Sequence, residues 1–369
     1  MSTDDATPTT PLRHSPLHER HVAAGARMAE FAGWEMPIDY GSVVAEHMAV
    51  RSAAGMFDLT HLGTVTVTGE GAEATIQQSF TNDVSGLAEG TSQYSLCLDE
   101  QAGIIDDLLV YRVGPGFLVV PNAANTAVVA GRLLDQAKAV GECSVQVVDL
   151  ACVAVQGPDS VGALGSGMAA AGLGGDPGAL AYLACVDAGD GVILSRSGYT
   201  GEVGFEVFLP GERAGGLWDA LAEGGVQPAG LGCRDTLRLE MGYPLHGNDI
   251  STDTTPVEAL LNWAVKPGTG FVGEEAYVAA KEAGASRKLR GIKADGRRAP
   301  RAGDDVLVDG TEVGIVTSGS FSPINEVGIG LAYLDAAVDL GTVVEVDVRG
   351  RGVAATVVRP PFVEAHTKD

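Results

Sequence analysis

The chain has 369 residues, and its 24 basic and 48 acidic side chains give it a formal net charge of −24. This balance argues against nucleic acid and anionic membranes as partners, because binding to their phosphates needs clustered Lys and Arg. No apolar run reaches the roughly 18 residues that cross a bilayer, and Met1–Pro16 lacks an apolar signal-peptide core. We therefore expect a cytoplasmic protein of two or three domains, with a flexible tail over residues 1–15.

Cysteine and histidine spacing gives no support for a metal site. The five cysteines are widely spaced and form no C-x-x-C pair, which is typical of reduced thiols. His18 and His21 lie three residues apart, and we interpret them as a solvated helix face rather than as metal ligands. No G-x-G-x-x-G motif opens a helix after a strand and no P-loop lysine is present, so nucleotide binding of those kinds is not predicted.

The first 80 residues predict a mixture of helices and strands. Apolar spacing indicates a helix over Leu17–Gly33. Ser42 is the expected N-cap of a second helix, Val43–Ala54, which Gly55 ends. Residues 63–68 alternate as a strand does, and a further helix is expected over Glu70–Ser79.

The stretch Tyr94–Val113 contains two apolar runs around a turn and predicts a β-hairpin. Asp106 and Asp107 stand in the middle of the second run. Successive side chains of a strand point to opposite faces, so we expect the two carboxylates on different faces, Asp107 in a row with Ile105. Because an unpaired buried carboxylate is costly, the pair has either a function or backbone amides to bond.

Two asparagines follow the next predicted strand, Phe117–Pro121, and precede a long predicted helix, Thr126–Ala139. A strand-to-helix junction is a common place for ligand recognition. Asn122 is therefore a candidate binding residue. The alternative is that Asn122 or Asn125 caps the helix.

A second unusual stretch runs from Val192 to Leu209. Its glycines 198, 201 and 204 permit close approach of a ligand to the backbone. Glu206 then emerges inside an apolar strand, as Asp107 does, on the same face as Phe208.

Arg234 and Arg238 are four residues apart near the start of a predicted helix and share one face. They either pair with Asp235 and Glu240 on the helix surface, or Arg234 faces a carboxylate ligand at the helix start. Both interpretations stay open at this point.

The last part of the chain predicts only strands. After a linker at Gly284–Arg287, short strands flank tight turns at Asp309-Gly310 and at Arg349–Gly352. This pattern is typical of a small barrel or sandwich of about 80 residues.

Five motifs, in the same order along the chain, resemble those of the glycine cleavage system T protein, the aminomethyltransferase family. They are Pro16-Leu17-His18-Glu19-Arg20-His21 with Phe31–Pro37, Gly103-Ile104-Ile105-Asp106-Asp107-Leu108, Ser197-Gly198-Tyr199-Thr200-Gly201-Glu202, Pro228-Ala229-Gly230-Leu231-Gly232-Cys233-Arg234-Asp235 and Thr317-Ser318-Gly319-Ser320-Phe321-Ser322-Pro323. Each motif alone is weak, but together they span nearly the whole chain and are specific.

The resemblance implies an α+β fold of three domains around a central folate cavity. Two interleaved domains would occupy residues 16–283 and a β-barrel-like domain residues 288–365. It also implies an enzyme that passes the aminomethyl group from the dihydrolipoyl arm of the H protein to tetrahydrofolate. Ammonia and 5,10-methylenetetrahydrofolate are the products, tetrahydrofolate is a co-substrate, and no metal is required.

The resemblance further assigns roles to individual residues. Asp107, the second Asp of its motif, would lie against the folate where the carbon is received, and could stabilise positive charge there or relay a proton. Glu206 matches the carboxylate that binds the pterin, and Arg234 a ligand-binding residue suited to the anionic glutamate tail. The remaining matches to the lining of the folate cavity are Tyr94, Asn122, Tyr199, Tyr243 and Trp263.

Two stretches depart from the family pattern. Thr60-His61-Leu62-Gly63 stands where Ser-His-Met-Gly is usual, a conservative change in volume. Pro361-Phe362-Val363-Glu364 stands where many bacterial members have Pro-Phe-Tyr and basic residues. The tyrosine and basic residues that would make the family's C-terminal folate contact are therefore missing from this stretch, and Arg359 and Lys368 are the alternatives.

Three other interpretations are less favoured. Demethylases and the folate domains of dimethylglycine- and sarcosine-oxidising enzymes usually belong to longer chains with a flavin domain, whose fingerprint is not found here. Folate-binding proteins of iron–sulfur maintenance carry a Lys-Gly-Cys-Tyr motif that this chain lacks. A plain scaffold would leave the carboxylates in apolar strands unexplained.

Overall fold

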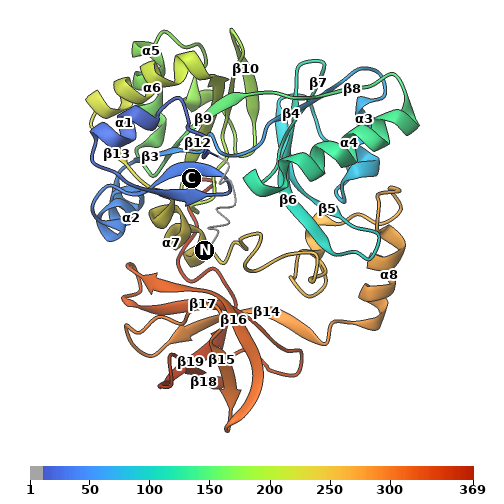
Figure 1. Cartoon of the computed structure of the whole chain (residues 1–369), viewed down its shortest axis with the longest axis vertical. Coiled ribbons are helices and arrows are strands. Elements are labelled where there is room, and N and C mark those ends of the chain that lie inside the picture. Colours follow the sequence, from blue (N-terminus) through green and yellow to red (C-terminus); the bar gives the residue numbers. More distant parts are fainter. Residues whose placement is uncertain (1–10) are drawn as a thin grey trace, which may run out of the picture.

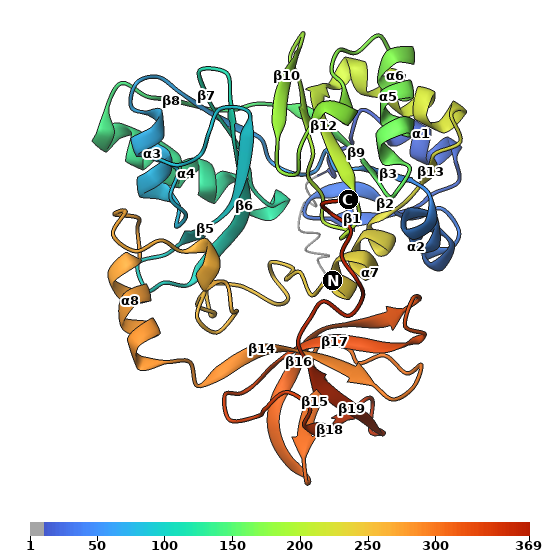
Figure 2. The same cartoon turned by 180° about the vertical axis from the view of Figure 1, so that it is seen from behind.

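The computed structural model describes residues 11–369, which form three lobes (Figure 1). Two lobes, each built on its own sheet, lie side by side, and a closed barrel lies below them; Figure 2 shows the same arrangement from behind. The chain starts in the first lobe, crosses to the second, returns, and then enters the barrel. We propose on this path that residues 16–283 hold two interleaved domains and residues 288–365 a third. No helix in the described part of the chain is long and apolar enough to span a membrane.

The chain begins differently from the sequence prediction. The predicted helix Leu17–Gly33 is wrong: α1 covers only His18–Ala23, and a hairpin of β1 (Arg27–Phe31) and β2 (Trp34–Asp39) follows. Ala32 and Gly33 both have positive φ, 50° and 82°, as a two-residue hairpin turn demands. The predicted cap is confirmed, since the Ser42 side chain accepts a hydrogen bond from the Ala45 amide and caps α2 (Val43–Ser52). The predicted end at Gly55 is wrong, because Ala53 is the C-cap and Gly55 begins strand β3.

The tail predicted for residues 1–15 falls mostly on residues 1–10, which lie outside the described residues. Of the remainder, Arg13 forms a bridge with Trp34. Ser15 is buried and its Oγ donates to Asp58 Oδ2 over 2.5 Å. These contacts attach residues 13 and 15 to the first lobe.

The first lobe is built on a six-stranded sheet. In spatial order its strands are β10 (Cys185–Gly189), β11 (Val192–Ser195), β12 (Gly204–Pro210), β9 (Leu150–Gln156), β3 (Gly55–Asp58) and β13 (Gln227–Pro228). Helices α5 (Ser160–Ala170) and α6 (Gly211–Glu223) cover one face, where Phe205 and Val207 are buried. Phe208 packs on the opposite face, toward the second lobe. The period-two prediction for this strand is confirmed.

The second lobe is built on a five-stranded sheet. In spatial order its strands are β5 (Thr91–Leu98), β6 (Ile104–Val113), β7 (Gly116–Val120), β4 (Val65–Thr68) and β8 (Ser144–Val147). Helices α3 (Ala72–Ser79) and α4 (Thr126–Val140) pack against each other, and buried residues of both join those of the sheet in one core cluster. The predicted hairpin is confirmed, since β5 and β6 pair antiparallel.

A bulge changes which residues share a face of β6. Cys97 pairs with Asp106 and Leu98 with Ile104, so Ile105 is the extra residue. Ile105 therefore packs in the cluster that contains Leu108, and the predicted row of Ile105 with Asp107 is wrong. Beyond the bulge the alternation resumes, which places Asp107 in line with Leu109 and Tyr111. These two pack between the sheets, so Asp107 lies on the β6 face that turns toward the first lobe.

The barrel follows α7 (Leu231–Met241), a long connection and α8 (Glu274–Ala283). In spatial order it contains β14 (Arg287–Ala294), β17 (Val327–Asp335), β16 (Thr311–Ser322), β15 (Asp305–Val308), β18 (Val343–Asp347) and β19 (Gly352–Val358). Both predicted tight turns are confirmed. Asp309-Gly310 and Arg349-Gly350 have positive φ at both residues, as such turns require. Short 3₁₀ helices occur at Ala123–Asn125, Pro177–Ala179 and Asn262–Ala264.

Buried charges join α7 to the first lobe and to the barrel. Glu240 accepts from Arg51 Nη2 over 2.8 Å and from Ser322 Oγ over 2.5 Å. Arg238 donates to Asp249 over 2.7 Å and to Ser318 over 2.8 Å. Since an unpaired buried charge is strongly destabilising, these contacts hold α7 in one position.

The C-terminal segment leaves the barrel and returns to the first lobe (Figure 2). The Phe362 amide donates to the Glu240 carbonyl, and the His366 amide to the Gly201 carbonyl, each over 2.7 Å. Lys368 lies 5.8 Å above the ring of Tyr182. The segment therefore packs beside α7 and the glycine-rich stretch.

Candidate active site

Asp107 is held by a residue of β5, Tyr94, and by Asn122, which follows the end of β7. The Tyr94 hydroxyl donates to Oδ2 over 3.1 Å, and Asn122 Nδ2 donates to Oδ1 over 3.0 Å. Burial raises the pKa of Asp107, while the Tyr94 hydrogen bond and the nearby His246 oppose that rise. The structure thus brings together three of the predicted site residues and fixes the orientation of the carboxylate.

Asp106 is fully buried behind Asp107 and is bonded by two asparagines. It accepts from the Asn122 backbone amide over 3.0 Å, from Asn122 Nδ2 over 2.8 Å and from Asn125 Nδ2 over 2.7 Å. Neither asparagine makes a side-chain capping hydrogen bond, so the capping alternative is wrong. Burial, and next the charge of Asp107, raise the pKa of Asp106 to about 7 against the effect of these donors.

This raised pKa predicts a pH dependence of stability. A carboxyl group whose pKa is higher in the folded than in the unfolded state binds its proton more tightly in the folded protein. It stabilises the fold fully at pH values below the pKa of the unfolded state. This contribution is lost as the pH rises through the folded-state pKa of Asp106, about 7. We expect Asp106 to lower the free energy of unfolding by about 2 kcal/mol between roughly pH 5 and 8. Urea unfolding should show this slope in the wild type and lose it in Asp106→Asn. Exposed Asp135→Asn is the control that keeps it, and equal slopes in wild type and Asp106→Asn would contradict the prediction.

Glu206 lies buried where the two sheets meet. Its Oε2 accepts from Ser197 Oγ over 2.6 Å and from the Tyr111 hydroxyl over 3.2 Å. Tyr111 is four residues after Asp107 on β6, and so shares its face. This side chain therefore connects the Asp107 strand to the Glu206 strand. Oε1 of Glu206 has no hydrogen-bond partner among residues 11–369 and is available to a ligand.

A third group gathers around Tyr199. The Arg234 guanidinium lies 4.8 Å from the Tyr199 ring centroid, and the Tyr199 and Tyr243 rings stack 5.6 Å apart. The Tyr199 hydroxyl donates to the Pro244 carbonyl. Burial is the largest influence on the pKa of Tyr199, and the charges of Arg238 and then Asp107 follow. The Tyr199 hydroxyl is therefore close enough to Asp107 for the two to interact electrostatically.

The two arginines of α7 have different surroundings. Arg238 is buried and pairs with Asp235 and Asp249, so the helix-surface interpretation holds for the Asp235 contact only. Glu240 pairs with Arg51 instead of with either arginine. Arg234 is half-buried and forms no ion pair within the described part of the chain. This leaves a cation beside the site with its donors unused.

Trp263 stands at the edge of the Asp107 group. Its ring stacks on Tyr94 at 5.1 Å, and 58% of the residue is exposed. The eight predicted residues thus form three groups: Asp107 with Tyr94, Asn122 and Trp263; Glu206; and Arg234 with Tyr199 and Tyr243.

Sequence reasoning missed other members of these groups. Tyr111 and Ser197 hold Glu206, and a period-two pattern from Asp107 could have indicated Tyr111. His246 contacts Asn125 Nδ2 over 3.1 Å and the Ile104 carbonyl over 3.2 Å. No local pattern marks His246, because its partners lie more than a hundred residues away.

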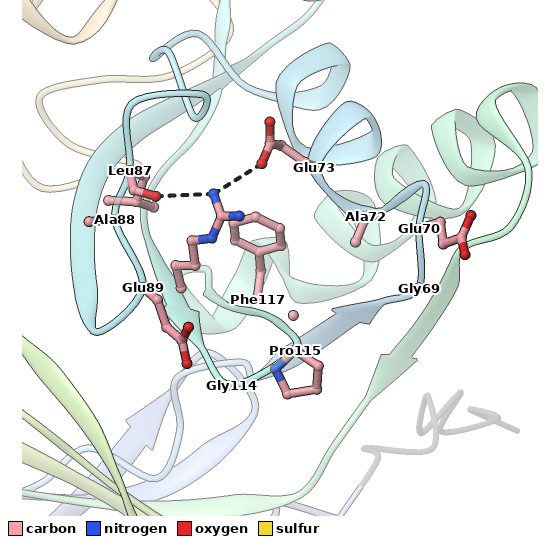
Figure 3. A pocket seen from close by; sticks show the side chains of 12 residues that line it. Gly69, Glu70, Ala72, Glu73, Leu87, Ala88, Glu89, Gly114, Pro115 and Phe117 are labelled. Atoms are coloured by element: carbon pink, nitrogen blue, oxygen red, sulfur yellow. Dashed lines mark hydrogen bonds and ion pairs between the residues drawn. The ribbon is translucent and has the colours of Figure 1, made fainter.

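A cavity of about 470 Å³ opens elsewhere in the second lobe, beside Arg112 (Figure 3). Arg112 donates there to Glu73 over 3.0 Å and to the Leu87 carbonyl over 3.1 Å. None of the eight predicted residues lines it. The candidate site is therefore defined by its side-chain contacts and not by this cavity.

One group of side chains has the composition of a metal site. His14 Nε2 and His18 Nε2 lie 3.1 and 2.8 Å from Glu35 Oε2. However, the imidazole rings are parallel within 5° and stacked at 3.8 Å, so their in-plane lone pairs cannot both point at one ion.

The prediction that His18 and His21 form a solvated helix face is wrong for His21. This residue is buried and contacts Asp58 over 2.9 Å and Tyr40 over 2.8 Å.

Comparisons with known proteins agree with these observations. The family described as "GCVT N-terminal domain" matches residues 17–269, and the "Glycine cleavage T-protein C-terminal barrel domain" matches residues 287–364. Relatives named aminomethyltransferase from Mycobacterium avium (strain 104) and Frankia alni are 46% and 48% identical, over 97% and 95% of this chain and 98% of each relative.

The crystal structure of glycine cleavage system aminomethyltransferase T from Bartonella henselae superposes with a TM-score of 0.91 at 37% identity. It covers 97% of this chain and 100% of that one. The predicted α+β fold with a C-terminal barrel is thereby confirmed. The chain belongs to the glycine cleavage T-protein family of aminomethyltransferases.

Proposed function

We propose that this chain transfers the aminomethyl group carried on the lipoyl arm of an H protein to tetrahydrofolate in the cytoplasm. One observation carries the proposal: β6 and β12 bring Asp107 and Glu206 to the junction of two sheets, where Tyr111 connects them. Each carboxylate is oriented by hydroxyl or amide donors, which is how a prepared binding site differs from a surface charge.

Glu206 would receive the pterin. A pterin presents an edge of N–H groups, and a carboxylate can accept paired hydrogen bonds from it. Oε2 is already held by Ser197 and Tyr111, which fixes the side chain while Oε1 stays available. The Tyr199, Tyr243 and Trp263 rings would supply apolar surface for the flat parts of the folate.

Asp107 would act on the one-carbon unit. Loss of ammonia from the aminomethyl group leaves an electrophilic, cationic carbon, and a folate nitrogen attacks it. A carboxylate at this position stabilises the positive charge and orients the nitrogen. Tyr94 and Asn122 hold the carboxylate in place before the substrate arrives. Arg234, with its donors unused, would anchor the anionic glutamate tail.

The proposal is tested with purified H protein whose lipoyl arm carries the aminomethyl group. With tetrahydrofolate we expect ammonia and 5,10-methylenetetrahydrofolate in equal amounts, and the same rate after treatment with a metal chelator. Dimethylglycine and sarcosine are the competing donors. Turnover of these methylated amines, without turnover of the lipoyl-bound group, would overturn the proposal in favour of a demethylase.

A further inference from the structure

The loop after α7 lies between two groups of the candidate site. Its Pro244 carbonyl accepts a hydrogen bond from the Tyr199 hydroxyl. Two residues further along, His246 Nδ1 lies 3.1 Å from Nδ2 of Asn125. These two contacts connect the Tyr199 group with the residues around Asp107.

Bonds within the loop hold His246 in place. Asp249 Oδ2 accepts from buried Arg238 over 2.7 Å and from the Leu245 amide over 2.9 Å. Gly247 follows His246 directly, and its φ of 88° lets the chain turn back on itself. A residue with a Cβ is strained at this φ. The loop therefore presents His246 from a fixed backbone that is anchored on α7.

The hydrogen bonds of His246 determine which ring nitrogen carries the proton. Asn125 Nδ2 has two hydrogens: Asp106 Oδ1 accepts one over 2.7 Å, and His246 Nδ1 accepts the other over 3.1 Å. Nδ1 is therefore unprotonated. Nε2 carries the hydrogen and donates it to the Ile104 carbonyl over 3.2 Å. A charged imidazolium would turn a second N–H toward the Asn125 amide hydrogens, so the contact requires the neutral ring.

Asn125 and Asn122 share one oxygen of Asp106. Asn122 Nδ2 donates to Asp106 Oδ1 over 2.8 Å and to Asp107 Oδ1 over 3.0 Å. If the Asn125 amide turned over, its oxygen would face Asp106 Oδ1, and two acceptors would be in contact without a hydrogen between them. His246 opposes this rotation by accepting from Nδ2 of Asn125. The orientation of both amides, and through them that of the Asp107 carboxylate, therefore depends on His246.

We propose that His246 is a positioning residue, which orients the Asp107 carboxylate through this chain of hydrogen bonds. The assignment rests on the function proposed above. Both ring nitrogens of His246 are occupied, so it acts on Asp107 and not on the folate or the one-carbon unit. Because its loop also accepts from the Tyr199 hydroxyl, it keeps the Asp107 carboxylate at a fixed place relative to the Tyr199 group. Its loss should therefore affect the chemical step more than the binding of folate.

The kinetics of three variants test this assignment. His246→Leu should lower kcat for the release of ammonia from the aminomethylated H protein roughly tenfold. The KM for tetrahydrofolate and the calorimetric Kd for 5-formyltetrahydrofolate should stay unchanged. His246→Asn keeps an acceptor for Asn125 and should recover part of kcat. Asn125→Leu should also lower kcat, and the double variant of His246→Leu with Asn125→Leu should lose less than the product of the two single losses. An unchanged kcat in His246→Leu, or a loss confined to KM, would overturn the assignment.

Two further measurements separate this role from a structural one and from the proposed function. Thr64→Val removes a hydrogen bond to the Val148 carbonyl in the same lobe, so it should lower the unfolding temperature but keep kcat. Nitrogen-15 NMR of the ligand-free wild type should show His246 with a protonated Nε2 and an unprotonated Nδ1, and Asn125→Leu should show a mixture of both forms. The opposite form in the wild type would overturn the assignment. A wild type with the expected NMR signature but without turnover would overturn the proposed function and leave the orientation of Asp107 by His246 in place.

Discussion

Asp107→Asn should lower turnover about 100-fold to 1000-fold while changing the affinity for reduced folate little. The substitution keeps the shape of the side chain but removes the negative charge that would face the cationic one-carbon unit. In the proposed site Glu206 binds the pterin and Arg234 the tail, so most of the affinity should survive. Steady-state release of ammonia from the aminomethylated H protein measures the turnover, and calorimetry measures the affinity.

The control for this variant is Asp135→Asn on the exposed face of α4, which removes the same charge far from the site and should leave turnover unchanged. The pH profile distinguishes the two roles of Asp107. If it relays a proton, one limb of the wild-type profile disappears in the variant; if it stabilises charge, the profile keeps its shape at a lower rate. Wild-type turnover in Asp107→Asn would remove this residue from the mechanism.

Glu206→Gln should weaken the binding of reduced folate about 100-fold. The pterin would donate two hydrogen bonds to the carboxylate, and bonds to a charged acceptor contribute about 1.5 kcal/mol or more each. The amide of Gln presents a donor where the pterin also presents one. Calorimetric titration with a stable reduced folate measures the loss.

Three further variants show whether the loss comes from the carboxylate itself. Tyr111→Phe and Ser197→Ala each remove one donor to Oε2 but keep the carboxylate, so their losses should be smaller than that of Glu206→Gln. Glu73→Gln, at the cavity beside Arg112, should bind folate like the wild type. Unchanged affinity in Glu206→Gln would refute the pterin assignment.

Local patterns were sufficient for much of the fold. The hairpin around Asp106, the tight turns Asp309-Gly310 and Arg349-Gly350, and the alternation around Glu206 depend on residues a few positions apart. Each of these features is set by strand geometry or by turn conformation, which neighbouring residues determine. The sequence therefore predicts which side chains belong to the same strand. In β12 it also predicts which of them point to the same face of the sheet.

Other features depend on contacts that the sequence does not display. The bulge that moves Ile105 to the other face follows from the pairing of β5 with β6, and not from the composition of β6 alone. The hydrogen bond between Tyr111 and Glu206 joins residues 95 positions apart. Helical spacing in Leu17–Gly33 was overridden by the positive φ of Ala32 and Gly33, which form a turn. Turn conformation, strand pairing or a distant contact, rather than the composition of one segment, decided each of these outcomes.

A crystal structure of the protein with bound 5-formyltetrahydrofolate tests the central claim most directly. We expect the pterin edge against Oε1 of Glu206, the ring nitrogens beside Asp107, and the glutamate carboxylate at Arg234. Folate bound instead in the cavity beside Arg112, or at any place without contact to Asp107 and Glu206, would contradict it.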